Sequence, residues 1–106
     1  MVLYNKLVRD RIPELIQSHG EKATVRILEP EAFLRCLEEK LEEELAEYRR
    51  EGESGNRMEE LADILEVVYA LAATQGCTEE ALDRIRLAKR ENRGGFAKRL
   101  FLVSKE

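Results

Sequence analysis

Residues 30–50 read PEAFLRCLEEKLEEELAEYRR and predict one long amphipathic helix. At about 100° per residue, a single stripe along this helix carries the apolar side chains of Leu34, Leu37, Leu41, Leu45 and Tyr48. Pro30 suits the first helical turn, where its missing N–H would have no intrahelical partner. The stretch from Gly52 to Gly55 then interrupts the chain. The sequence therefore encodes a helix with one apolar face for a core.

A second helix is expected over residues 56–75, with Gly76 as its stop. Its first apolar face carries Met58, Leu61, Leu65, Val68 and Ala72, and its second carries Ile64, Val67 and Leu71. A helix that is apolar over more than half of its circumference is covered from two sides. Since the chain offers only about four helices, we expect another subunit to supply part of that cover.

Shorter elements are expected around this pair of helices. Asp10 is a candidate N-cap for a short helix over residues 14–19, which Gly20 would close. Thr78 should begin a further long helix that runs to about Asn92.

Residues 24–28 and 99–103 resemble short strands, and the sequence leaves open a two-stranded hairpin between them. Apart from that option, the pattern predicts an all-α fold, an antiparallel helical bundle. The length of 106 residues suits a single domain over residues 1–106.

Composition excludes several classes of function. The net charge of −4 argues against broad nucleic-acid binding, which needs a basic surface. No secretory apolar region opens the chain and no apolar run is long enough for a membrane span, so we expect a cytoplasmic protein without a membrane partner. Cys36 and Cys77 form no CxxC pattern and are interpreted as reduced, buried thiols.

Two pairs of acidic residues lie on the two long helices, each pair three residues apart. They are Glu44 with Glu47, and Glu60 with Asp63. This spacing puts both carboxylates of a pair on one side of their helix. A short loop should make the helices antiparallel neighbours, and the four carboxylates would then converge. Glu60 falls in line with Leu71 in an apolar face, so its charge needs compensation, which a hard cation such as Mg²⁺ would supply.

The same glutamates have a simpler interpretation. Residues 38–51 are rich in Glu, Lys and Arg, and such runs usually form solvated faces with ion pairs four residues apart. Lys40 with Glu44 fits the ion-pair pattern, and Glu47 and Glu51 belong to the same charged run. Spacing alone leaves both interpretations open.

Four stretches together resemble one known family. KLEEELAE at 40–47 and EELADIL at 59–65 look like the EExxE…ExxD signature of the MazG-like, all-α nucleoside triphosphate pyrophosphohydrolases. YNKLVRDRIP at 4–13 and RGGF at 93–96 resemble the start and the ending of one small subgroup of that family. The resemblance thus covers nearly the whole chain.

The resemblance implies an enzyme that uses Mg²⁺, with Mn²⁺ as an alternative. The residues it implies as metal ligands are Glu44, Glu47, Glu60 and Asp63. Glu43 would support these ligands or orient water, and the general base would be Glu43 or Glu44. Family members cleave between the α- and β-phosphates and form dimers or tetramers. A second register, beginning at Glu38, also matches EExxE, but Lys40 precedes the first register in the family manner.

Cations are needed to stabilise the departing pyrophosphate. The candidates are Lys6, Arg9, Arg11, Lys89, Arg93 and Lys98. We favour Lys6 and Arg9 because they lie in the N-terminal motif, and Arg93 because the two glycines after it permit close approach to a ligand. The plain alternatives are exposed surface cations and a simple helix stop.

Two functions therefore compete. The first is Mg²⁺-dependent hydrolysis of a nucleoside triphosphate to a monophosphate and pyrophosphate, in a role such as the removal of non-standard nucleotides. The second is a non-catalytic helical module for oligomerisation or nucleotide sensing. If the protein is such a module, each of the four acids of the two spaced pairs can be replaced singly without harm. The sequence does not name the base or the sugar.

Overall fold

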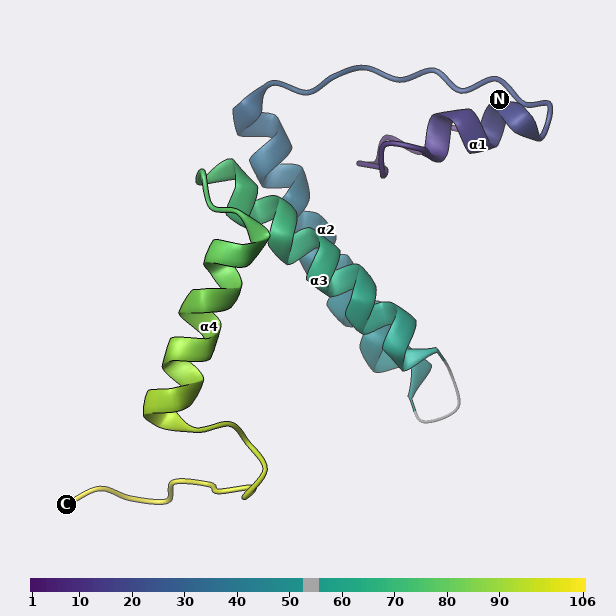
Figure 1. The fold of residues 1–106 in the computed structure, drawn as a ribbon. Coiled ribbons are helices and arrows are strands. Elements are labelled where there is room, and N and C mark those ends of the chain that lie inside the picture. The colour runs from purple at the N-terminus through teal and green to yellow at the C-terminus, as the bar shows by residue number, and fades with distance from the viewer. Residues whose placement is uncertain (53–55) are drawn as a thin grey trace.

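The computed structural model describes residues 1–52 and 56–106. Its helices are α1 (Ile12–Ser18), α2 (Pro30–Glu51), α3 (Arg57–Thr74) and α4 (Glu79–Arg93). Figure 1 shows these four elements along the chain. The three longer helices begin and end within two residues of the bounds expected from the sequence. The described part of the chain is therefore all-helical, as predicted.

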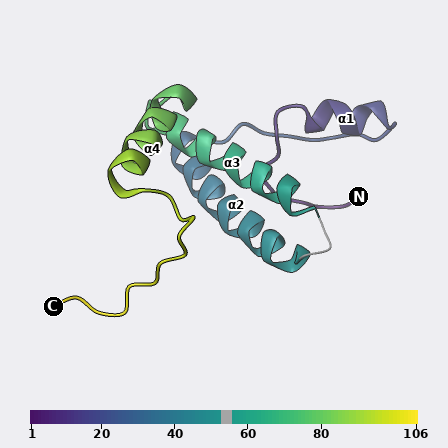
Figure 2. The ribbon, with the colours of Figure 1, turned by 60° about the horizontal axis from the view of Figure 1, so that its bottom comes forward.

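The centre of the molecule is a hairpin of two long helices. α2 and α3 lie side by side and run in opposite directions (Figures 1 and 2). The buried apolar side chains in the described ranges are Leu37 of α2, 3% exposed, and Val67 of α3, 8% exposed. Near the loop end of the hairpin, the Arg57 guanidinium lies 4.4 Å from the centroid of the Tyr48 ring. Apolar burial and this cation–π contact both connect the two helices.

The turn after α3 sets the direction of α4. Gly76 has a φ of 75°, which a residue without a Cβ adopts at no steric cost, and its N–H donates to the Ala73 carbonyl at 3.0 Å. Thr78 then caps α4 as expected, because its Oγ1 accepts from the Ala81 N–H at 3.1 Å. α4 leaves the hairpin beyond this turn and points away from it (Figure 1).

The start of α1 differs from the sequence expectation. Its N-cap position is Arg11, not Asp10, and no side chain caps the helix. The reason is a turn that precedes the helix and contains Asp10. In this turn the Ile12 N–H donates a hydrogen bond of 3.0 Å to the Arg9 carbonyl. Gly20, at φ 83°, ends the short helix as expected.

The expected β-hairpin does not form, and this part of the prediction is wrong. Residues 24–28 and 99–103 contain no strand; they are irregular chain in the structure. They lie on opposite sides of the molecule, in the linker before α2 and in the segment after α4 (Figure 1). A strand needs a partner for its backbone hydrogen bonds, and neither segment reaches one. Alternating residues alone could not supply that pairing.

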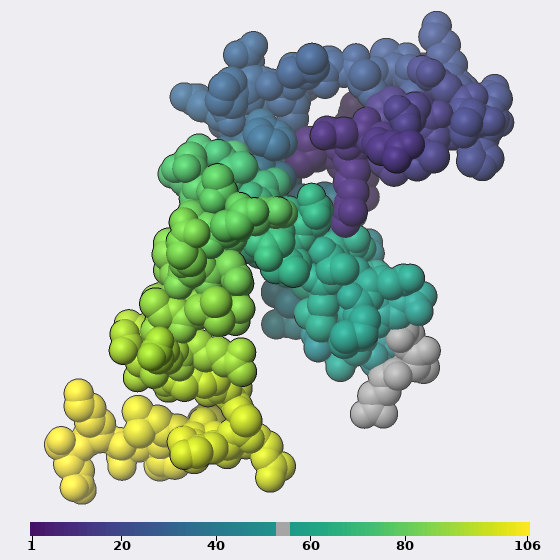
Figure 3. Space-filling view, viewed as in Figure 1, coloured from purple at the N-terminus to yellow at the C-terminus, as the bar shows by residue number. Residues whose placement is uncertain are grey.

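The chain is extended. Its radius of gyration is 18.0 Å and its extents are 61 × 37 × 23 Å, whereas a compact chain of this length would have a radius of about 13 Å. α1 with its linker and the segment after α4 project from the hairpin (Figure 3). Within residues 1–52 and 56–106, no helix is both long and apolar enough to cross a bilayer.

Candidate metal centre

Three carboxylates meet where α2 faces α3. Glu44 and Glu47 come from α2, one turn apart, and Glu60 comes from the first half of α3. Each offers a carboxylate oxygen, and these oxygens all lie within 4.8 Å of one another. The antiparallel hairpin brings them together because both helices present one side to the same interface. The structure thus gathers three of the four acids that the sequence singles out.

Two oxygens of this cluster lack a hydrogen-bond donor. Glu44 is only 6% exposed, and its Oε2 has no donor among the described residues. Oε2 of Glu60 is likewise buried without a donor from the described part of the chain. Lys40 forms an ion pair with Glu44, with its Nζ 3.6 Å from Oε1. Buried carboxylate oxygens without donors are costly, so the cluster needs a further positive partner.

The raised pKa of Glu60 also indicates that the cluster needs a further positive partner. Burial, repulsion from Glu47 and a hydrogen bond with Glu44 together raise the pKa of the Glu60 carboxyl above its ordinary value. In the absence of a cation, the Glu60 carboxyl therefore retains its proton more readily than an isolated glutamate does. A divalent cation would compete with that proton for the same oxygens.

Asp63, the fourth predicted ligand, lies outside the cluster. Its Oδ1 accepts a hydrogen bond of 2.6 Å from Arg9 Nη2. Its charge still contributes to the raised pKa of Glu60, one turn away on α3. Asp63 is therefore a neighbour of the three-carboxylate group and is held by a guanidinium.

Glu43, the predicted water-orienting residue, also has a cationic partner. Lys6 Nζ donates to Glu43 Oε1 at 2.8 Å. This hydrogen bond lowers the pKa of the Glu43 carboxyl and raises the pKa of the Lys6 ammonium. Lys6 and Arg9, predicted as phosphate ligands, thus lie beside the cluster, bound to carboxylates. These pairings join residues 37 and 54 positions apart, and no local sequence pattern indicates them.

Arg93, the third predicted phosphate ligand, lies elsewhere. It is the last residue of α4, and its side chain is exposed. α4 begins beside the end of α3 and runs away from the hairpin, whereas Glu60 lies near the start of α3 (Figure 1). Within one chain, the structure does not bring Arg93 to the carboxylates.

Arg57 is a residue at this site that sequence reasoning missed. It lies one turn before Glu60 and covers the ring of Tyr48, the residue after Glu47. Its Nε is buried without an acceptor among the described residues. The sequence signal would have been an arginine at the start of α3 opposite an aromatic residue near the end of α2.

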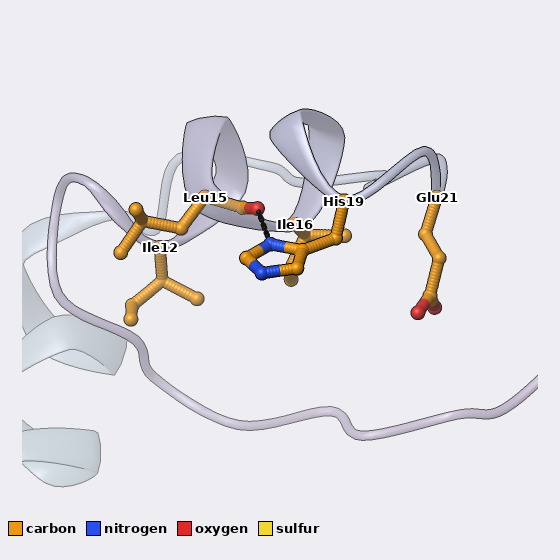
Figure 4. Close-up of a pocket in the computed structure, with 5 residues that line it drawn as sticks. All are labelled: Ile12, Leu15, Ile16, His19 and Glu21. Carbon is orange, nitrogen blue, oxygen red and sulfur yellow. Dashed lines mark hydrogen bonds between the residues drawn. The ribbon is translucent and has the colours of Figure 1, made fainter.

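Two hollows in the surface lie away from the carboxylates. One, of about 260 Å³, lies against α1 and is lined by Ile12, Leu15, Ile16, His19 and Glu21 (Figure 4). There the His19 ring hydrogen-bonds the Leu15 carbonyl through Nδ1 at 2.8 Å. The other, of about 560 Å³, lies between the start of α2 and the end of α3. Neither is lined by a predicted site residue, so the candidate site is the carboxylate cluster.

Comparison with known proteins gives little functional information. No family model matches the chain, and no solved structure matches it. An uncharacterized protein of Mycolicibacterium smegmatis is 48% identical over 44 residues. That match covers 42% of this chain and 45% of the relative, so the chain spans less than half of the relative's length.

Proposed function

We propose that this protein is an Mg²⁺-dependent pyrophosphohydrolase with a MazG-like helical bundle, acting on a nucleoside triphosphate or a related phosphorylated nucleotide. The observation that carries the proposal is the convergence of Glu44, Glu47 and Glu60, with two buried oxygens that receive no hydrogen bond from the described residues. The EExxE…ExxD pattern that contains the same residues supports it.

The donor set favours a hard cation. All three groups are carboxylates, and neither a cysteine nor a histidine belongs to the cluster. Mg²⁺ and Mn²⁺ accept such oxygen donors, and Mg²⁺ usually binds few carboxylates, so positions remain for water and phosphate. When bound, the metal would neutralise charge on the phosphate oxygens.

The chain's own residues would handle the water. In the proposed reaction, a water oxygen bonds to the α-phosphorus, the bond from that phosphorus to the bridging oxygen breaks, and pyrophosphate leaves with the bridging oxygen. The water's proton passes to a carboxylate. Glu44 fits the role of this base better than Glu43 does. No donor in the described part of the chain reaches Glu44 Oε2, whereas Lys6 donates to Glu43 and lowers the pKa of its carboxyl. Glu43 is partly open to solvent and would orient the water.

The test is pyrophosphate release from a panel of ordinary and damaged triphosphates, with Mg²⁺ or Mn²⁺. Glu60→Gln should lower release by at least about a hundredfold, because it removes a ligand and its charge. Glu59→Gln is the matched control, since Glu59 is the exposed neighbour of Glu60 and should tolerate the change. No release from any member of the panel would refute the proposal. Preference for damaged triphosphates would support a role in removing non-standard nucleotides.

A non-catalytic oligomerisation module is the second candidate. The observation in its favour is the large apolar surface that one chain leaves exposed, including Leu65 of α3 and Phe101 after α4. Thermal melting separates the two candidates. If the cluster is a metal centre, the melting temperature should be higher in millimolar Mg²⁺ than in chelator, because the metal binds the folded chain preferentially. An unchanged melting curve favours the module.

A further inference from the structure

The first eleven residues, here called the N-terminal arm, contact both of the helices that carry the carboxylate cluster. Lys6 of the arm pairs with Glu43 of α2 at 2.8 Å, and Arg9 pairs with Asp63 of α3 at 2.6 Å. Figure 3 shows the arm, in purple, reaching onto α3. Two cations of one segment are thus hydrogen-bonded to the two helices that carry the proposed metal ligands.

Asp63 is the acid whose placement needs explaining. It lies one turn from Glu60, and its charge acts on the Glu60 carboxyl, yet it is the one acid of the two spaced pairs that is absent from the cluster. Arg9 holds its Oδ1. Both side chains of this pair are largely open to water, at 57% for Arg9 and 41% for Asp63. Exposed ion pairs are weak, so this contact can be exchanged at little cost.

Resting on the proposed metal centre, we propose that Asp63 changes partner: Arg9 of the N-terminal arm holds it in the metal-free protein and releases it when a divalent cation binds. Asp63 then turns to the cluster as a fourth carboxylate. The released guanidinium stays beside the cluster, where it can donate to phosphate oxygens. Arg9 is therefore a positioning residue for Asp63 in the metal-free protein. After the cation binds, the same guanidinium is available to bind substrate.

The exchange makes a quantitative prediction about metal affinity. A cation that must displace Arg9 binds more weakly than one that finds Asp63 free. The strength of an exposed pair limits the difference to about two- to fivefold. Arg9→Ala should therefore tighten Mg²⁺ binding by about that factor. Loss of a nearby positive charge could tighten binding without any exchange, so a double-mutant cycle is needed.

The experiment is calorimetric titration of the full chain with MgCl₂, for the unmodified protein, Arg9→Ala, Asp63→Asn and the double variant. Arg11→Ala is the matched control, because Arg11 pairs locally with Glu14 at 2.9 Å. We expect Arg9→Ala to tighten binding about two- to fivefold, Arg11→Ala to leave it unchanged, and Arg9→Ala to have no effect in the Asp63→Asn background. Circular dichroism of each variant confirms that the helices form.

Two results would overturn the exchange while leaving the proposed function intact. One is unchanged Mg²⁺ affinity in Arg9→Ala. The other is that Arg9→Ala tightens Mg²⁺ binding equally in the Asp63 and the Asp63→Asn backgrounds. That result would assign the effect to repulsion between the Arg9 charge and the cation. Failure of the unmodified protein to bind Mg²⁺ would instead overturn both the exchange and the metal centre.

Discussion

At the scale of single residues, the cluster depends on charges placed where water cannot fully solvate them. Glu44 is almost completely buried, and Glu60 has a buried oxygen to which none of the described residues donates. Like charges in such positions favour the protonated form of one member. The three-carboxylate cluster is therefore an unfavourable arrangement that a bound cation would relieve.

This arrangement predicts how stability depends on pH. The folded-state pKa of Glu60 lies above its ordinary value of 4.5, so the folded chain still holds a proton at a pH where the unfolded chain has lost it. The free energy of unfolding of the metal-free protein should fall as pH rises from about 4.5 through the raised pKa. Above that window the stabilising contribution is fully lost. Glu60→Gln should remove this dependence.

Urea unfolding in chelator, from about pH 4 to about pH 8, measures the effect. Comparison with Glu60→Gln isolates it from other groups, including Glu43, whose lowered pKa acts in the opposite direction. Superimposable pH profiles for the two proteins would contradict the assignment.

The sequence predicted the convergence of these three carboxylates for a clear reason. The spacing of Glu44, Glu47 and Glu60 is local to two helices, and one short loop brings those helices together. The position of Asp63 was not predictable in this way, because its partner Arg9 lies 54 residues away on irregular chain. Helical periodicity gives no information about such a contact.

At the scale of elements, the helices follow local signals and the irregular segments do not. Pro30, Gly76 and Thr78 mark helix boundaries through their own backbone or capping chemistry, and the structure agrees with each. Residues 24–28 and 99–103 have the composition of strands but no partner. Strand formation is a property of two segments, so the composition of each segment alone was an insufficient guide.

The α2–α3 hairpin should be sensitive to its small core. Leu37→Ala removes the most buried apolar side chain of the described residues, and it should lower the free energy of unfolding by about 2–5 kcal/mol. Leu45→Ala, on the same helix but 41% exposed, should cost less than about 1 kcal/mol. Chemical denaturation of both variants provides the comparison. Equal losses would show that the hairpin packs differently.

At the scale of the whole molecule, one chain does not cover its own apolar surface. α3 exposes Met58, Leu61 and Leu65 along one side, which agrees with its two apolar faces in the sequence. After α4, exposed apolar side chains include Phe96, Leu100, Phe101, Leu102 and Val103. Exposed apolar patches of this kind mark association surfaces. We therefore expect copies of the chain to associate.

Sedimentation analysis checks this expectation. The protein should sediment as a dimer or larger species, and Leu65→Glu should shift it toward monomer by placing a charge on the exposed side of α3. Glu66→Gln, at the exposed neighbouring position, serves as the control and should leave the mass unchanged. A monomeric mass at every concentration would contradict the expectation and leave the α3 surface without an explanation.

The proposed metal centre requires the carboxylates of α2 and α3 to hold a divalent cation. Crystals soaked in Mn²⁺ and measured for anomalous scattering test it most directly. We predict an anomalous peak between Glu44, Glu47 and Glu60, within about 2.0–2.5 Å of their oxygens. Well-ordered helices with no peak at that position, or with these side chains turned toward solvent, would contradict it.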